Sequence, residues 1–121
     1  MFEFSVGKHT LTRNGETVEG GDQCYSGTGP GRNNVEMEDA RNVGPIPRGK
    51  YRIGPAHDDP ERGPCVMALT PMLGTNEFGR SGFLIHGNNA ENDASHGCLI
   101  APPMVRDFIN ASQDRILFVT S

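Results

Sequence analysis

Apolar and polar residues alternate over several short runs of this chain, which is the pattern of a half-buried β-strand. The first run, residues 2–6, places Phe2, Phe4 and Val6 on one side and polar side chains on the other. Runs that alternate in this way, or that are wholly apolar, predict further strands over 10–12, 16–18, 24–26, 51–53, 65–70, 83–86 and 115–119. The chain is therefore expected to consist mainly of short strands.

Turn-forming residues separate these runs. Asn14-Gly15 lies between the second and third runs and predicts a β-hairpin. The 16 glycines and 9 prolines of the chain would interrupt helices, so they favour a turn-rich β protein. Residues 57–64 are polar and predict a loop, and residues 27–42 predict a longer loop without periodicity. We expect this longer loop to be either a lid over a site or disordered surface.

One helix is predicted near residues 103–111. Pro102 and Pro103 open it, and proline is favoured in the first turn of a helix. The apolar residues that follow are spaced so that they share one helical face; they are Met104, Val105, Phe108 and Ile109. The fold class predicted from all these elements is mainly β, with curved antiparallel sheets and one short helix, in a single domain over residues 1–121.

Composition excludes several classes of protein. The formal net charge of −4 and the pI near 5.5 argue against a nucleic-acid partner, which needs a basic patch. No apolar run approaches the roughly 18 residues of a membrane span. The first residues show no basic segment followed by an apolar one, so we expect no secretory signal peptide and synthesis in the cytoplasm.

The chain has three cysteines, an odd number, so at least one thiol is free. We expect Cys24 and Cys65 to be small buried apolar residues rather than a disulfide pair. Cys98 differs because it follows Ser95-His96-Gly97 and precedes an apolar pair. Glycine at position 97 allows a sharp turn that would bring backbone N–H groups near a reacting carbonyl. Cys98 is therefore the candidate nucleophile, the alternative being an inert buried thiol.

A free cysteine ionises near pH ~8.5, so a catalytic thiol needs a base beside it. His86, which ends an apolar strand, is the preferred candidate base, and a satisfied core histidine is the alternative. His96 is two residues from the thiol, where alignment for proton transfer is poor, so we expect it to orient groups or handle a second proton. Ser95 is expected to hold an imidazole tautomer or simply to form the turn.

Other chemistries fit less well. His86, His96 and Cys98 are residue types that bind zinc, but no C-x-x-C or H-x-x-x-H pair accompanies them, so no metal is expected. The Gly-rich run 27–31 lacks the Gly-Lys-Ser/Thr ending of a phosphate-binding loop. No cofactor is predicted.

The Ser95-His96-Gly97-Cys98 block, preceded by His86-Gly87, resembles the signature of the L,D-transpeptidase (YkuD-like) catalytic domains. Outside this block the chain resembles a small branch of that family found among type VI secretion effectors. The segments that carry this second resemblance are 25–27, 44–54, 63–64, 69–71 and 79–87. The resemblance implies a sandwich- or barrel-like β fold.

The resemblance also implies roles for single residues. It makes Cys98 the acylated nucleophile, His86 its proton acceptor, and the amides around Gly97 and Cys98 the oxyanion hole. Ser95 and His96 would support the site. Family members place an arginine or asparagine two residues after the cysteine, where this chain has Ile100. A substrate contact is therefore expected to be lost, or moved to Arg80 or Arg106. The candidate substrate-binding residues are Arg80, Arg106 and Tyr25.

The function that follows is attack of Cys98 on peptidoglycan tetrapeptide stems, through a thioester that water or an amine resolves. Hydrolysis, exchange and crosslinking stay open. The expected setting is a toxin delivered by a secretion apparatus to the periplasm of a target bacterium, with an immunity protein in the producer. The alternatives are a housekeeping wall enzyme without its leader and a catalytically silent wall-binding module. A papain-like peptidase does not fit, because that family places its cysteine near the N-terminus.

Overall fold

Ten strands, one α-helix and three 3-10 turns make up the chain, which the computed structural model describes from Met1 to Ser121. The strands are β1 (Phe2–Ser5), β2 (Thr10–Arg13), β3 (Glu16–Thr17), β4 (Tyr25–Ser26), β5 (Gly49–Ile53), β6 (His57–Asp59), β7 (Gly63–Pro71), β8 (Leu84–His86), β9 (Leu99–Ile100) and β10 (Ile116–Thr120). The helix is α1 (Pro103–Ala111), and the 3-10 turns are η1 (Gly21–Gln23), η2 (Gly29–Gly31) and η3 (Val35–Met37). The mainly β fold predicted from the sequence is confirmed, and α1 has the predicted bounds.

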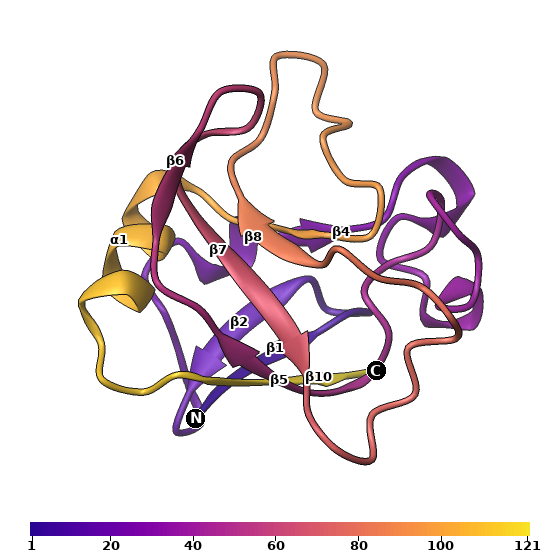
Figure 1. Ribbon diagram of the computed structural model, residues 1–121, viewed down its shortest axis with the longest axis horizontal. Coiled ribbons are helices and arrows are strands. Elements are labelled where there is room, and N and C mark those ends of the chain that lie inside the picture. Colours follow the sequence, from indigo (N-terminus) through magenta and orange to yellow (C-terminus); the bar gives the residue numbers. More distant parts are fainter.

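The strands form one hydrogen-bonded sheet in the order β3-β2-β1-β10-β5-β7-β8-β9-β4, with β6 paired to β7 outside this path. Neighbouring strands are antiparallel except for two parallel pairs, β1 with β10 and β8 with β9. The sheet does not close into a barrel. It is sandwich-like: β8 and β4 lie in the upper part of the view and β1, β2 and β10 in the lower part, and β5 and β7 connect the two halves (Figure 1). The predicted antiparallel sheet is therefore a mixed one.

The core lies between the two halves of this sheet. Phe2, Phe4 and Val6 are wholly buried while Glu3 between them is exposed, as their alternation predicts. Ile85 of β8 and Leu99 of β9 point into the same 19-residue cluster. One face of β8 and of β9, the strands next to the candidate site residues, thus packs against the main core.

Helix α1 lies beside β7 (Figure 1) but buries a different face from the one predicted. Val105 and Ile109 are wholly buried, whereas Met104 and Phe108 are 52% and 46% exposed. Arg106 takes an inward position in their place, because its guanidinium finds backbone carbonyls as hydrogen-bond acceptors. The helix therefore presents an apolar pair to solvent, where Phe108 touches the edge of Phe2 with ring centroids 6.1 Å apart.

The predicted loop 57–64 contains a hairpin that the sequence pattern missed. β6 pairs with β7 through His57–Val66 and Asp59–Gly63. Asp59 Oδ1 accepts hydrogen bonds from the N–H groups of Glu61 and Arg62 at 2.8 and 3.0 Å, which fixes the tight turn between the strands. Polar side chains can line such a projecting hairpin because it covers little of the core.

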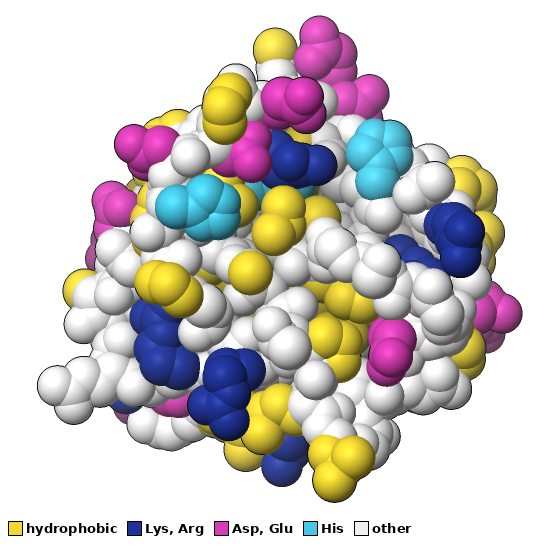
Figure 2. Space-filling model, in the orientation of Figure 1, with side chains coloured by type: hydrophobic (Ala, Val, Ile, Leu, Met, Phe, Trp, Pro, Cys, Tyr) yellow, Lys and Arg dark blue, Asp and Glu magenta, His cyan; other side chains and the backbone are white.

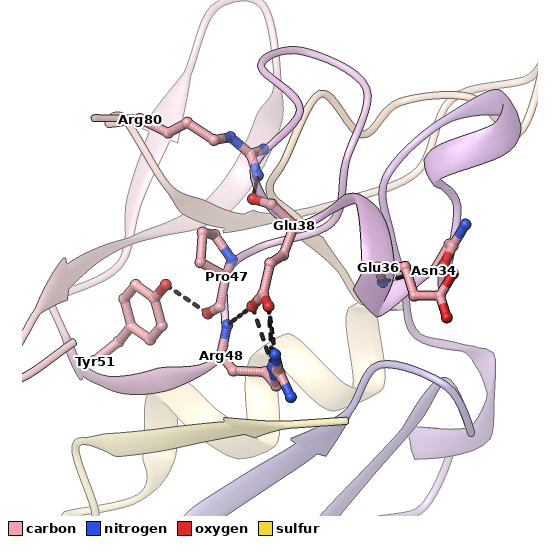
Figure 3. A network of polar contacts seen from close by, with 7 residues as sticks. All are labelled: Asn34, Glu36, Glu38, Pro47, Arg48, Tyr51 and Arg80. Atoms are coloured by element: carbon pink, nitrogen blue, oxygen red, sulfur yellow. Dashed lines mark hydrogen bonds and ion pairs between the residues drawn. The ribbon is translucent and has the colours of Figure 1, made fainter. Parts of the chain in front are cut away.

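The segment 27–42, predicted as a loop, is ordered and is not disordered surface. It contains η2 and η3, and Glu38 at its end is only 8% exposed. The Glu38 carboxylate accepts hydrogen bonds from the Arg48 backbone N–H and from its guanidinium, the shortest at 2.6 Å (Figure 3). These charge-assisted contacts fasten the segment to the start of β5. They hold the pKa of Glu38 below its usual range despite partial burial.

All three cysteines are free, as the sequence analysis expected for Cys24 and Cys65. Cys24 is buried, and desolvation raises the pKa of its thiol to about 12. Cys65 is half-buried at the start of β7. No helix in the structure has the length and apolar character needed to cross a bilayer.

Candidate active site

The parallel pairing of β8 and β9 places His86 and Cys98 on one face of the sheet. Ile85 lies opposite Leu99, and His86 lies opposite Ile100. Cys98, immediately before β9, is therefore two positions along from His86 and shares its face, because side chains alternate with a period of two. A strand spacing of about 4.8 Å and a rise of about 3.3 Å per residue put their Cα atoms roughly 8 Å apart. The two side chains share this face without a hydrogen bond between them.

This face is the one turned away from the main core. The register continues through Tyr25, which lies opposite Ile100, so His86, Ile100 and Tyr25 form one row across three strands. Ile100 is 1% exposed and lies outside the core cluster. The residue two positions after Cys98 is thus a buried apolar side chain on this face.

His86 is 5% exposed, and its ring orientation is fixed by its neighbour. Nδ1 lies 2.9 Å from the Gly87 carbonyl oxygen, which can only accept, so Nδ1 carries the proton and Nε2 is the basic nitrogen. Burial lowers the pKa of His86, and the positive charges of Arg62 and Arg106 lower it further. His86 is therefore a neutral imidazole near pH 7 that is able to accept a proton.

Cys98 is half-buried, with Sγ 3.9 Å from the Gly82 carbonyl oxygen. Desolvation raises the pKa of its thiol, while the Leu84 N–H and the guanidinium groups of Arg62 and Arg80 counteract part of that rise. The histidine pKa is lowered and the cysteine pKa raised, so the resting pair is a neutral thiol and a neutral imidazole. A sulfur that attacked from this state would have to pass its proton to a base.

Ser95 is wholly buried and shapes the turn before Cys98. Its hydroxyl donates to the Cys98 carbonyl at 2.8 Å and accepts from the N–H groups of Gly27 and Gly97 at 2.8 and 3.3 Å. It contacts no imidazole, so the structure favours the turn-forming interpretation of Ser95. Ser26 adds a second donor to the same carbonyl, also at 2.8 Å.

The amides of this turn are not equivalent. The Gly97 N–H already donates to Ser95, whereas the Cys98 N–H has no protein acceptor. Of the two amides implied by the family resemblance, the one at Cys98 is therefore available to a developing oxyanion. Gly97 has φ +119°, and a Cβ there would collide with the Arg80 guanidinium, so this position requires glycine.

His96 is exposed, and its Nδ1 lies 3.3 Å from the Asn42 carbonyl oxygen. It lines both of two surface hollows. One, of about 270 Å³, contains Cys98 and is bordered by Arg41, Arg80 and residues 79–83. The other, of about 320 Å³, contains His86. A larger hollow of about 450 Å³ lies between the β2–β3 hairpin and α1 and has neither a histidine nor a cysteine in its lining.

Arg80 and Arg106, expected as substrate-binding residues, are each only 6% exposed and are occupied by backbone carbonyls. The Arg80 guanidinium donates to the Glu38 carbonyl at 2.5 Å (Figure 3). It also donates to the carbonyls of Pro45 and Gly44, at 2.7 and 3.0 Å. That of Arg106 donates to those of Ala101 and Pro64 at 3.0 and 2.5 Å. Both side chains act as clamps between loops, and Arg80 also places positive charge near Cys98.

Tyr25 likewise serves the scaffold. Its hydroxyl donates to Asn88 Oδ1 at 2.7 Å and accepts from the Ala94 N–H at 3.0 Å, so it ties together both limbs of the loop between β8 and β9. The Arg32 guanidinium covers the ring at 3.7 Å from its centroid. Tyr25 therefore helps to shape the loop next to the site, and its hydroxyl is not free to bind a substrate.

Arg62 is the site residue that sequence reasoning missed. It lies in the turn between β6 and β7 and lines the His86 hollow. Figure 2 shows Lys/Arg, Asp/Glu and His side chains gathered near the top of this face, where the β6–β7 hairpin and the loop after β8 project in Figure 1. The polar run 57–64 gave no sign of pairing with β7, so nothing in the sequence placed Arg62 near His86. No three His, Cys, Asp or Glu side chains converge in a way that could hold a metal ion.

Replacement of Ser95 by alanine tests its part in the turn. Ser95→Ala leaves the buried Gly27 N–H without an acceptor, so it should lower the free energy of unfolding by about 2–4 kcal/mol. The matched change Ser81→Ala is at an exposed position and should alter it by less than about 0.5 kcal/mol. Urea denaturation measures both; equal stability of the two variants would contradict the assignment.

The neutral resting pair predicts how Cys98 responds to pH. Its rate of alkylation by iodoacetamide should rise through a midpoint above the value of about 8.5 typical of a free cysteine, since only the thiolate reacts. Peptide mass spectrometry would separate Cys98 from Cys24, which should stay unlabelled because it is buried. A rate that is already maximal at pH 7 would indicate a resting thiolate–imidazolium pair instead.

Comparison with known proteins adds a family to this geometry. No curated protein matches the sequence at a significant level. The family model described as the Tlde1 domain matches residues 21–114. The matched range covers most of the chain and contains Cys98, His86, Ser95 and the clamping arginines. The chain therefore belongs to the Tlde1 domain family, which is associated with effectors of type VI secretion.

Proposed function

We propose that this protein is a cysteine-dependent L,D-transpeptidase and L,D-carboxypeptidase that acts on the tetrapeptide stems of peptidoglycan. The observation that carries the proposal is the shared face of His86 and Cys98 on paired strands, with Nε2 of His86 left basic. Membership of the Tlde1 family supports a wall-directed effector enzyme. The YkuD-like signature around Cys98 supports the specific reaction.

In this mechanism, Sγ of Cys98 attacks the carbonyl carbon of the third stem residue and its proton passes to Nε2 of His86. The carbonyl oxygen becomes an oxyanion that accepts a hydrogen bond from the free Cys98 N–H, a contribution of about 3 kcal/mol. The bond to the terminal D-alanine then breaks. His86 returns the proton to the leaving amine, and the stem remains attached to Cys98 as a thioester.

The thioester can be resolved in three ways. Water gives a carboxypeptidase product, a free D-amino acid gives exchange, and the amine of a neighbouring stem gives a crosslink. In each case His86 takes a proton from the incoming nucleophile and returns it to the sulfur. The Cys98 hollow is open to the surface, so it gives water direct access to the thioester.

Incubation of the purified protein with tetrapeptide muropeptides tests the reaction. We expect loss of the terminal D-alanine, detected by chromatography and mass spectrometry, and a decrease of at least about 10³-fold in the Cys98→Ala variant. Intact tetrapeptides, or equal cleavage by wild type and Cys98→Ala, would refute the proposed activity. Release of D-alanine, its exchange and dimer formation are separate products in the same assay.

The biological role that we propose is that of an antibacterial toxin that acts in the periplasm of a target cell. Effectors of this kind require an immunity protein in the producer and a component of the secretion apparatus for delivery. A housekeeping wall enzyme would perform the same chemistry without harm to its host, and a silent wall-binding module would perform none.

Expression in two compartments separates these roles. Cytoplasmic expression should leave growth unchanged because the wall is out of reach, whereas fusion to an export signal should cause swelling or lysis. Exported Cys98→Ala is the control and should be harmless. Equal viability of exported wild type and exported Cys98→Ala would contradict a toxic enzyme.

A further inference from the structure

Arg62 differs from Arg80 and Arg106 because its guanidinium is largely unoccupied. Its side chain is 43% exposed, and its one polar contact is a long one, 3.5 Å from Asp59 Oδ2. Arg80 and Arg106, by contrast, are buried and donate to backbone carbonyls. An exposed ion pair at this distance contributes little, so most of the five N–H donors of Arg62 are free to bind a ligand.

Arg62 is also the one Lys or Arg side chain in the lining of the His86 hollow. The positive charge of Arg62 acts on both reacting groups. It lowers the pKa of His86, and it offsets part of the rise that burial causes in the pKa of Cys98. Glu61 and Asp93 border the same hollow and repel a ligand carboxylate, so Arg62 is the one Lys or Arg side chain in the lining that can attract it. The bidentate fork of a guanidinium matches a carboxylate.

The direction of the reaction decides which carboxylate this is. His86 returns a proton to the departing amine, so the residue that leaves must lie on the His86 side of Cys98. Its amine and its α-carboxylate are bonded to the same carbon, which places the carboxylate in the hollow that Arg62 lines. The rest of the stem then extends into the Cys98 hollow beyond His96.

We propose that Arg62 binds the free α-carboxylate of the leaving D-amino acid and so restricts the enzyme to stems that end at that residue. The inference rests on the proposed function and adds the determinant of substrate specificity to it. A stem whose last carboxyl is blocked or joined to a further residue has no negative charge at that position. Arg62 would therefore make the enzyme specific for chain ends.

Two synthetic substrates test this assignment, a tetrapeptide stem with a free terminal carboxylate and the same stem with a terminal carboxamide. Wild type should have a kcat/KM about 10- to 100-fold higher for the acid, as a charge-assisted contact provides. Arg62→Gln should lose this preference through a higher KM for the acid, with little change for the amide. Arg52→Gln, which removes an equal charge from an exposed position on β5, should retain it.

The outcomes are distinguishable from failure of the proposed activity. Equal cleavage of acid and amide by wild type would overturn the role of Arg62 and leave the thiol chemistry intact. An equal fall for both substrates in Arg62→Gln would also overturn it, because the residue would then act through Cys98 or through stability. Cleavage of neither substrate by wild type would refute the proposed reaction itself.

Discussion

The site depends on one constraint, the parallel register between β8 and β9. These strands are two or three residues long, yet their pairing fixes the sides on which His86 and Cys98 emerge. A slip of one residue would turn Cys98 to the opposite face and separate it from the imidazole. Ile85 and Leu99 oppose such a slip, because both are wholly buried in the core and would have to leave it.

Polar contacts, rather than more apolar surface, hold the loops around this pair. Buried arginines connect segments far apart in the chain, as Arg80 does with residues 38–45, and Ser95 and Tyr25 do the same with single hydroxyls. Every buried side-chain nitrogen and oxygen has a hydrogen-bond partner. A chain in which 35% of residues are hydrophobic can thus order long loops, since each buried donor replaces its lost water.

The sequence predicted what depends on neighbouring residues. The helix followed from Pro103 and its apolar spacing, the first hairpin from Asn14-Gly15, and the end of β8 at His86 from an apolar run. Contacts between residues that are distant in the sequence could not be predicted in this way. β6 was missed because its residues are polar, and Arg62 was missed with it. The exposure of Met104 and Phe108 and the burial of Arg106 depend on where carbonyls of other segments lie, which no local pattern records.

The central claim is that His86 and Cys98 react as a pair, and intact-protein mass spectrometry after rapid acid quench tests it most directly. With a tetrapeptide stem, wild type should gain the mass of that stem minus the mass of the D-alanine released, and peptide mapping should locate the adduct on Cys98. His86→Gln, which keeps the thiol but removes the basic Nε2, should show no adduct on the same time scale. An adduct that forms equally fast without His86, or one on Cys24 or Cys65, would contradict the account.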